Sequence, residues 1–298
     1  MRVAVTGSHG LIGSAVVSAL GARGDRVVRV VREGAGGPDE VTWQPATGHI
    51  DAARLNGIDA AVHFAGESLA ARWTPERRAA IRESRLRGTG LLAQALAGLP
   101  SRPRVLVSAS AVGYYGSRGD EVLTEASAPG TGFLAELCRE WEAAAGAARS
   151  AGIRVVHPRF GIVLAEQGGI LAKIAPIFRL GAGGPLASGR QYLPWVAIDD
   201  AVGAVLLALE RGSIAGPVNV VAPQAVTNRE FTAALGRAVG RPAVLPVPAA
   251  ALRAMFGDMA DEALLASQRV EPALLRAEGY DFRFGELERA LRHVLAAA

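Results

Sequence analysis

Three glycines near the start of the chain constrain its fold more than any other feature of the sequence. Gly7, Gly10 and Gly13 follow the apolar run Arg2–Val5, and apolar residues then recur at three- and four-residue spacing until Gly24. That spacing is typical of an amphipathic helix, and the run before it is typical of a buried strand. Glycines between the two allow a tight turn and a close approach of helix to strand. The sequence therefore predicts a strand, a glycine turn and a helix, in that order.

The predicted turn has the chemistry of a phosphate-binding site. The first amides of a helix have no acceptor within the helix, and the helix dipole favours an anion at that end. A run of the form G-x-x-G-x-x-G between a strand and a helix is typical of dinucleotide binding. We therefore expect the diphosphate of a dinucleotide to contact Gly7, Gly10, Leu11, Ile12 and Gly13.

Strands and helices alternate along the first part of the chain. β-branched runs that predict strands lie at Val27–Val31, Ala60–Phe64, Val105–Val107 and Ile153–Val156, and helical patterns lie at Pro75–Leu96 and Phe133–Arg149. A parallel connection needs a dozen or more residues and is usually made by a helix. The fold class is therefore predicted as α/β, with a Rossmann-type doubly wound parallel sheet.

The pattern loosens beyond residue 165, where stretches rich in glycine and proline appear. Helices are predicted near Asp199–Glu210 and Asn228–Val239, and Ala249–Ala298 is mainly helical in pattern. Because no low-complexity linker separates the two parts, we expect them to pack tightly. The prediction is an NADP-binding Rossmann domain over residues 1–165 and, interleaved with it, a smaller substrate-side and C-terminal helical region over residues 166–298.

The residue at the end of the second strand indicates which dinucleotide binds. An acidic side chain about 20 residues after the glycines would bind the ribose 2′-hydroxyl of NAD. Arg32 stands there instead, with Glu33 beside it, and Arg29 is a weaker alternative. A guanidinium suits a 2′-phosphate, because a charge-assisted hydrogen bond contributes roughly 1.5–3 kcal/mol. We therefore predict NADP as the cofactor, while Glu33 leaves a contact to a ribose hydroxyl open.

Composition and charge argue against several other classes of protein. The chain is 50% hydrophobic and 20% charged, which is typical of a globular protein, and no apolar run reaches the roughly 18 residues of a membrane span. The single cysteine, Cys138, cannot form an internal disulfide, and the five histidines show no metal-ligand spacing. The net charge of +4 is spread along the chain. We therefore expect a cytoplasmic protein with no metal, no membrane contact and no nucleic-acid partner.

These motifs together resemble the extended short-chain dehydrogenase/reductase superfamily, which contains the nucleotide-sugar epimerases. The strings that carry the resemblance are Thr6-Gly7-x-x-Gly10-x-x-Gly13, His63-Phe64-Ala65-Gly66 and Val107-Ser-Ala-Ser110-Ala-x-x-Tyr-Tyr-Gly116. A narrower set is similar to an atypical branch, the epimerase-family oxidoreductases: Ala65-Gly-Glu-Ser68, Ser84-Arg85 before Thr89, Leu180-Gly-x-Gly-Gly-Pro185, Tyr192-x-Pro-Trp195-x-x-x-Asp199 and Arg269-Val-x-Pro272. The resemblance covers almost the whole chain.

The resemblance implies a Rossmann domain that holds NADP, with a substrate pocket between that domain and the C-terminal region. It also implies that two arginines contact the phosphate or ribose groups of the cofactor, and that a short segment lies against the cofactor. The arginines are Arg32 and Arg85, and the segment comprises Phe64, Ala65 and Gly66. A salt-bridged arginine on the surface is the alternative interpretation of Arg85.

The catalytic pair that the resemblance leads us to expect is missing. Typical members carry a tyrosine and, four residues later on one helix, a lysine that lowers the phenol pKa. Lys173 is the only lysine of the chain, and Gly169 stands four residues before it. Counting from Ser110 to the following helix places Phe133 and Leu137 at the two positions. Neither of those side chains can move a proton.

Two kinds of replacement for the missing pair are open. Tyr114 or Tyr115 is a candidate proton donor, with Arg118 four residues after Tyr114, and Ser110 is a candidate partner of the reacting oxygen. Carboxylates could serve as acid or base instead. The carboxylate candidates are Glu67, Asp199 and Asp200, although the two aspartates are more typical of helix caps.

The leading hypothesis is an NADP-dependent oxidoreductase or epimerase-like protein that acts by hydride transfer on a small polar substrate. The missing tyrosine and lysine support an alternative from another class, a regulatory or sensor protein that binds NADP without turnover. A nucleic-acid-associated factor would rest on net charge alone.

Overall fold

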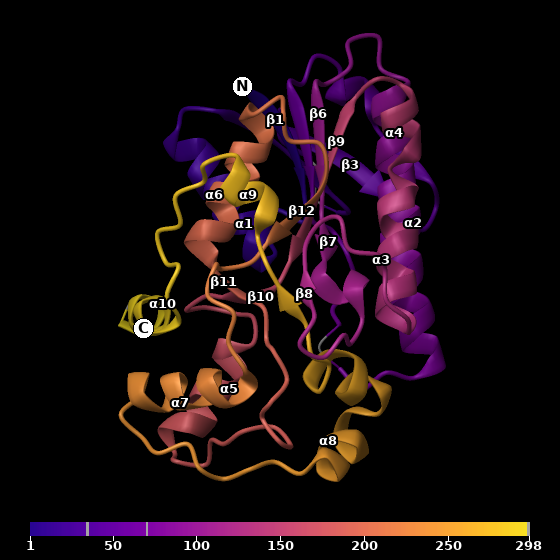
Figure 1. The fold of residues 1–298 in the computed structure, drawn as a ribbon. Helices are drawn as coiled ribbons and strands as arrows, with labels where there is room; N and C mark the ends of the chain where they lie inside the picture. The colour runs from indigo at the N-terminus through magenta and orange to yellow at the C-terminus, as the bar shows by residue number, and fades with distance from the viewer. Residues whose placement is uncertain (34–35, 70, 297–298) are drawn as a thin grey trace.

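The central sheet of the protein is parallel apart from one edge. The computed structural model describes residues 1–33, 36–69 and 71–296 (Figure 1). The sheet strands are β1 (Arg2–Thr6), β2 (Arg26–Val31), β3 (Glu40–Gln44), β4 (His49–Ile50), β5 (Ala60–His63), β6 (Val105–Ser108), β7 (Ser110–Ala111), β9 (Arg154–Phe160) and β12 (Gly216–Val220). Their order is β12-β9-β6-β5-β1-β2-β3-β4, with β7 paired to β9, and only β3 and β4 run antiparallel.

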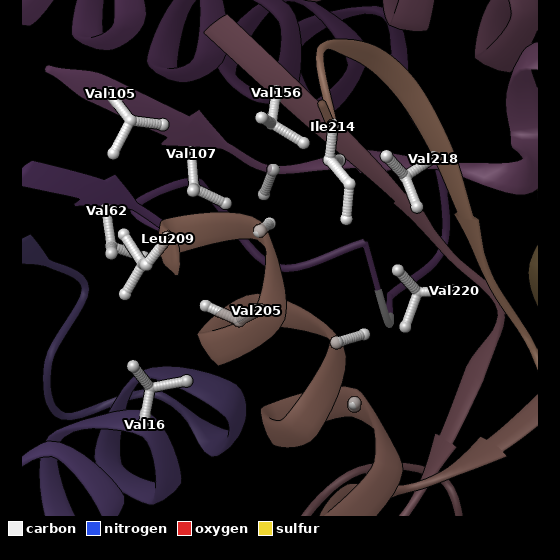
Figure 2. Packing of buried hydrophobic residues seen from close by; sticks show 14 of the residues in the cluster. Val16, Val62, Val105, Val107, Val156, Val205, Leu209, Ile214, Val218 and Val220 are labelled. Atoms are coloured by element: carbon white, nitrogen blue, oxygen red, sulfur yellow. The ribbon is translucent and has the colours of Figure 1, made fainter. Parts of the chain in front are cut away.

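Helices cover both faces of this sheet, as the doubly wound arrangement requires. They are α1 (Leu11–Ala22) and α6 (Ile198–Glu210) on one face, and α2 (Pro75–Ala97), α3 (Phe133–Ala144) and α4 (Gly146–Ser150) on the other. Figure 2 shows Val205 and Leu209 of α6 pointing towards the valines of the sheet strands, with Val16 of α1 below them. Alternate residues of one strand serve the two faces: Val3 belongs to this cluster and Ala4 to the opposite one.

The predicted fold class is confirmed, and the chain beyond residue 165 contributes to the same sheet. Both α6 and β12 come from that part, and β12 pairs in parallel with β9 at the sheet edge. The sequence did not predict β12, because Gly216 and Pro217 interrupt its apolar run, and proline is tolerated on an edge strand. The division of the chain at residue 165 stays a prediction about two interleaved parts.

A smaller, mainly helical region lies beyond the carboxyl ends of the sheet strands (Figure 1). Its elements are β8 (Val122–Leu123), β10 (Ile162–Leu164), α5 (Leu171–Arg179), β11 (Trp195–Ala197), α7 (Asn228–Ala238), α8 (Ala249–Phe256), the π-helical turn Ala260–Leu264, β13 (Arg269–Val270) and α10 (Leu287–Ala296). The short helix α9 (Ala273–Ala277) lies instead beside α6 and packs against β12. β10 pairs with β11 and β13 with β8. Trp195 and Leu291 are fully buried in the core of this region, so it has packing of its own.

Asp200 attaches this region to α6 on the sheet, and the prediction that it caps that helix is wrong. Helix α6 starts at Ile198, which places Asp199 and Asp200 inside its first turn. The buried Asp200 carboxylate accepts hydrogen bonds from the backbone N–H groups of Arg283 and Phe284, both at 2.9 Å. Burial raises the pKa of this carboxyl although the two N–H donors oppose the shift. Its role is therefore to hold the segment before α10 against α6.

Candidate functional site

The glycine turn leaves no room for side chains at two of its positions. Gly7 has φ +64, and a Cβ there would lie 2.8 Å from backbone atoms of Phe64 and Ala65. A Cβ on Gly13 would lie 2.1 Å from the carbonyl oxygen of Gly7. The turn is therefore packed tightly between the end of β5 and the first turn of α1, and glycine is required at both positions.

The first turn of α1 presents backbone donors beyond this glycine turn. Gly10 is the N-cap and makes no side-chain cap hydrogen bond. Among the described residues, the first amide of the helix with a backbone acceptor is that of Ser14, which donates to Gly10 at 2.8 Å. The hydroxyl oxygen of Ser8 is buried and also lacks a partner in the described part of the chain. Free donors at a helix N-terminus fit an anion.

A hydrogen-bonded threonine joins the glycine turn to the segment after β5. The hydroxyl oxygen of Thr6 accepts from the backbone N–H groups of Phe64 at 3.2 Å and Ala65 at 3.3 Å. Its own proton is then left for Nδ1 of His63, 2.7 Å away. Burial, with the charge of Arg85 nearby, lowers the pKa of His63 to about 4, so the ring is neutral near pH 7. This network fixes Phe64 and Ala65 where the resemblance places cofactor contacts.

Arg85 is a buried guanidinium on α2 that forms no ion pair with any described residue. Its side chain is directed at the backbone, donating to the carbonyl oxygens of Glu67 at 3.0 Å and Ile81 at 3.3 Å. The guanidinium lies 4.9 Å from the ring centroid of Trp141, and a Cβ on Gly66 would lie 3.3 Å from its Cζ. Burial lowers the pKa of Arg85 although the nearby charge of Glu67 opposes the shift. The surface interpretation of this arginine is wrong.

Arg32 lies at the end of β2 with its side chain exposed. It makes no ion pair or hydrogen bond with another residue of the described ranges, and Glu33 beside it is exposed too. Its position matches the predicted one, and its contact with a 2′-phosphate stays a prediction. Glu67, a carboxylate candidate from the sequence, pairs with Arg77 at 2.9 Å and is not among the residues that line the cavity described below.

A cavity of about 230 Å³ lies where the two parts of the chain meet. One wall comes from the strand ends and α3, including Val112, Leu137 and Phe160. The other wall comes from the loop before β11 and the π-helical turn, including Leu193 and Leu264. Its position at the carboxyl ends of parallel strands is the usual ligand crevice of such sheets. Arg85 also lines the cavity, and its guanidinium lies against Gly66 in the segment after β5.

The two positions expected for the catalytic pair hold apolar side chains on α3. Phe133 packs against Trp73 with ring centroids 5.3 Å apart, and Leu137 is buried and lines the cavity. The neighbouring Cys138 also lines it, and burial raises the pKa of its thiol to about 12. The thiol therefore stays protonated near pH 7 and is no nucleophile.

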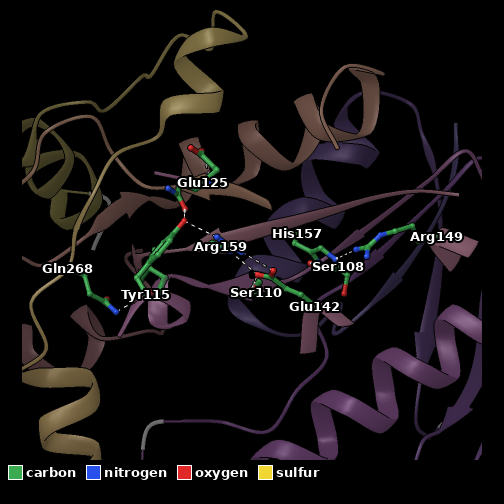
Figure 3. A network of polar contacts seen from close by, with 11 residues as sticks. Ser108, Ser110, Tyr115, Glu125, Glu142, Arg149, His157, Arg159 and Gln268 are labelled. Carbon is green, nitrogen blue, oxygen red and sulfur yellow. Dashed lines mark hydrogen bonds and ion pairs between the residues drawn. The ribbon is translucent and has the colours of Figure 1, made fainter. Parts of the chain in front are cut away.

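Ser110 belongs to a buried ionic network and not to the cavity wall (Figure 3). Its hydroxyl donates to Glu142 of α3 at 2.7 Å. The same carboxylate receives two hydrogen bonds from Arg159 of β9, at 2.8 and 2.9 Å. Arg159 also donates to the hydroxyl of Tyr115 at 3.0 Å, which in turn donates to Asn219 at 2.7 Å. Ser110 thus joins α3 to the sheet, and its catalytic role stays a prediction.

Tyr114 is likewise absent from the cavity lining. Its ring faces the guanidinium of Arg159, with Cζ 3.4 Å from the ring centroid. The prediction that Arg118 supplies the neighbouring charge is wrong, because Arg118 is paired with Glu121 at 2.6 Å. The four-residue spacing does not bring Arg118 to Tyr114, since the intervening residues form a short 3-10 turn and a loop. The role of Tyr114 as proton donor stays a prediction.

Two ionisable side chains that the sequence did not single out as acids or bases line the cavity. Tyr192 precedes β11, and its backbone N–H is held by Ser267 at 3.0 Å. Glu262 comes from the π-helical turn, and its Oε2 accepts from the N–H of Leu134 at 2.8 Å. Glu262 thereby reaches the start of α3, directly after Phe133. Only the fold could reveal this pairing, because 128 residues separate the two.

The described residues contain no group of three or more metal-ligating side chains, and none of their helices is both long and apolar enough to span a bilayer.

The comparisons with known proteins agree with this geometry. The NAD dependent epimerase/dehydratase family matches residues 3–221, and residues 247–294 match a domain of unknown function, DUF1731. An epimerase family protein of Mycobacterium bovis is 43% identical over 290 residues, covering 97% of this chain and 96% of its own. Epimerase family protein SDR39U1 of Homo sapiens is 39% identical over 300 residues, covering 99% and 100%.

Solved structures show the same relationship. A crystal structure of human SDR39U1 (isoform 2) with NADPH has a TM-score of 0.92 at 37% identity and covers both chains fully. A nucleoside-diphosphate sugar epimerase of Corynebacterium glutamicum has a TM-score of 0.84 at 36% identity, covering all of this chain and 58% of its own. A UDP-glucose 4-epimerase of Thermus thermophilus in complex with NAD shares the fold, with a TM-score of 0.76 at 23% identity, covering 99% and 98% of the two chains. This chain belongs to the NAD dependent epimerase/dehydratase family.

Proposed function

We propose that the protein is an NADP(H)-dependent oxidoreductase that transfers a hydride to or from a small molecule in the cavity. The observation that carries the proposal is the glycine turn, where free amides at the start of α1 lie beside a segment fixed by Thr6. Arg85, which lines the cavity and forms no ion pair with any described residue, supports it. A relative that covers both chains fully is described with NADPH.

The residues of the turn fit the groups of a dinucleotide. The amides of Leu11 and Ile12 would hold the diphosphate, and Arg85 would balance negative charge near the ribose or phosphate. Arg32, exposed at the end of β2, would bind the 2′-phosphate that distinguishes NADP from NAD. The nicotinamide supplies the hydride chemistry when bound, and the protein orients the two reactants.

A proton must leave or enter the substrate oxygen when the hydride moves, and Glu262 is the group best placed for it. Phe133 and Leu137 have no exchangeable proton, and the Cys138 thiol keeps its proton near pH 7. Glu262 lines the cavity and holds one carboxylate oxygen at the N–H of Leu134, which leaves its Oε1 as a proton acceptor. Tyr192 is the second ionisable group able to serve.

A sensor that binds NADP without turnover is the second candidate. The apolar residues at the two positions of the catalytic pair favour it, since they remove the usual route of the proton. The two candidates differ in the fate of NADPH. An oxidoreductase consumes it when a suitable carbonyl compound is added, whereas a sensor changes only its conformation or its partners.

Titration with NADPH and with NADH, followed by nicotinamide fluorescence, tests the proposal. We expect tighter binding of NADPH, and a loss of roughly ten- to a hundredfold in NADPH affinity for Arg32→Ala with NADH affinity unchanged. Arg29→Ala distinguishes the two candidate arginines, because Arg29 lies within β2 and is the weaker alternative for the same contact: a loss confined to Arg29→Ala would move the assignment from Arg32 to Arg29. Equal affinities for the two coenzymes in the wild-type protein would contradict the 2′-phosphate assignment.

A further inference from the structure

The cavity offers a ligand mainly apolar surface. Its apolar lining includes Val112, Leu137, Trp141, Phe160, Ile162 and Leu193. These side chains come from both walls, so a ligand would meet them on opposite sides. Binding in such a site is driven by burial of apolar area, about 25 cal/mol per Å² removed from water. The sequence predicts a small polar substrate, and this lining gives that prediction no support.

The polar groups around the cavity are largely committed to the protein itself. The amide nitrogen of Gln191 donates to the carbonyl oxygens of Leu186 and Leu264, at 3.2 and 3.3 Å. That of Gln268 donates to the carbonyl oxygens of Val112 and Gly116, both at 3.0 Å. A sugar ring would lose hydrogen bonds to water in this place without gaining enough partners from the protein. The lining therefore disfavours a ligand with many hydroxyl groups.

The size and charge of the cavity also disfavour a nucleoside-diphosphate sugar. Its volume is about 230 Å³, while a site for a drug-sized ligand takes roughly 300–1,000 Å³ and an apolar cavity of about 150 Å³ accepts benzene. Arg85 is the one guanidinium among its lining residues, and it already donates to the carbonyl oxygen of Glu67. A diphosphate needs several such donors.

We propose that the site takes a small apolar carbonyl compound, aromatic or branched aliphatic, or the corresponding alcohol, and excludes nucleoside-diphosphate sugars. The proposal rests on the proposed function for its reaction. In the reductive direction, NADPH gives a hydride to the carbonyl carbon and becomes NADP. A C–H bond forms, the C=O π bond breaks, and the oxygen takes a proton that Glu262 passes from solvent.

Isothermal titration calorimetry with benzyl alcohol and with UDP-glucose tests the ligand class. Each compound is titrated into the free protein and into the protein saturated with NADP. We expect saturable binding of benzyl alcohol with a negative heat-capacity change, the mark of buried apolar surface, and no binding of UDP-glucose at the same concentration. Tighter binding of UDP-glucose, or no saturable binding of benzyl alcohol to either form, would overturn the proposal.

A polar substitution in the wall locates the binding in this cavity. Val112→Thr keeps the shape of the side chain and adds a hydroxyl to the lining, so we expect benzyl alcohol binding to weaken on the order of tenfold. Val122→Thr is the matched control, because Val122 is 42% exposed on β8 and is not a lining residue. Ile162→Thr, in β10, also adds a hydroxyl to the lining, although it shortens the side chain by one carbon, and it carries the test if thermal unfolding shows that Val112→Thr does not fold.

Unchanged benzyl alcohol binding in a folded wall variant would overturn the assignment to this cavity. Failure of the proposed function has a different signature. Absence of NADPH binding, or absence of benzaldehyde-dependent NADPH oxidation, would count against the oxidoreductase, while the alcohol titrations on the free protein would still decide the ligand class.

Discussion

Replacement of Gly13 by alanine should weaken NADPH binding in a protein that still folds. The new Cβ would lie 2.1 Å from the carbonyl oxygen of Gly7, about 1.3 Å short of an ordinary contact of 3.4 Å. Since the Cβ is fixed rigidly to its Cα and the oxygen belongs to the backbone, the start of α1 must move away from the turn. That movement disturbs the hydrogen bond from the Gly10 N–H to Gly7, now 2.9 Å long.

The expected losses of stability and of NADPH affinity follow from the atoms that the new Cβ displaces. Overpacking of this kind costs typically about 1–3 kcal/mol of stability. Misplacing two amide donors to a diphosphate, each contributing roughly 1.5 kcal/mol, removes about 3 kcal/mol of binding, or about a hundredfold in NADPH affinity. We therefore expect Gly13→Ala to bind NADPH about a hundredfold more weakly, measured by fluorescence titration below the unfolding temperature.

Gly21→Ala is the matched control on the same helix. A Cβ on Gly21 meets nothing within 4 Å, so this substitution should raise stability by roughly 0.5–1 kcal/mol and leave NADPH affinity unchanged. Wild-type affinity for NADPH in folded Gly13→Ala would refute the argument that the diphosphate lies on this turn.

Three further predictions concern charge and protons. His63 and His157 have pKa values lowered to about 4, chiefly by burial, so the unfolded chain binds their protons first as the pH falls. Between about pH 6.5 and pH 4, protonation of each histidine in the unfolded chain should lower the free energy of unfolding by up to about 3 kcal/mol. His157→Gln should make this pH dependence shallower in denaturant unfolding; an unchanged slope of the free energy of unfolding against pH would contradict the prediction. Glu142→Gln leaves the buried Arg159 charge uncompensated and should destabilise the fold by roughly 3–5 kcal/mol in urea; a change under about 1 kcal/mol would contradict a structural role. Glu262→Gln should lower the turnover rate more than it weakens substrate binding; an unaltered turnover rate would exclude it as the proton carrier.

The glycine turn and the sheet could be predicted from sequence because their signals are local. Gly7, Gly10 and Gly13 come directly between a strand and a helix, and the apolar runs have the lengths of buried strands. The Tyr-x-x-x-Lys pair could be excluded as easily, since the chain has one lysine. Arg32 could be placed at the end of β2 because the distance from the glycines is nearly fixed in such folds.

The cavity could not be predicted, because its walls come from segments far apart in the chain. Glu262 reaches α3 through a hydrogen bond to Leu134 that no spacing reveals. The spacing of Tyr114 and Arg118 was misleading, since the charge that contacts the tyrosine ring comes from Arg159 on β9. Asp200 has the sequence context of a helix cap but is bound by backbone amides 83 and 84 residues later.

A crystal structure of this protein grown with NADPH tests the central claim most directly. We predict the diphosphate within hydrogen-bond distance of the N–H groups of Leu11 and Ile12, with the 2′-phosphate at Arg32 and the nicotinamide facing the cavity beside Arg85. A diphosphate bound elsewhere, or a glycine turn that stays empty while NADPH occupies another part of the surface, would contradict it.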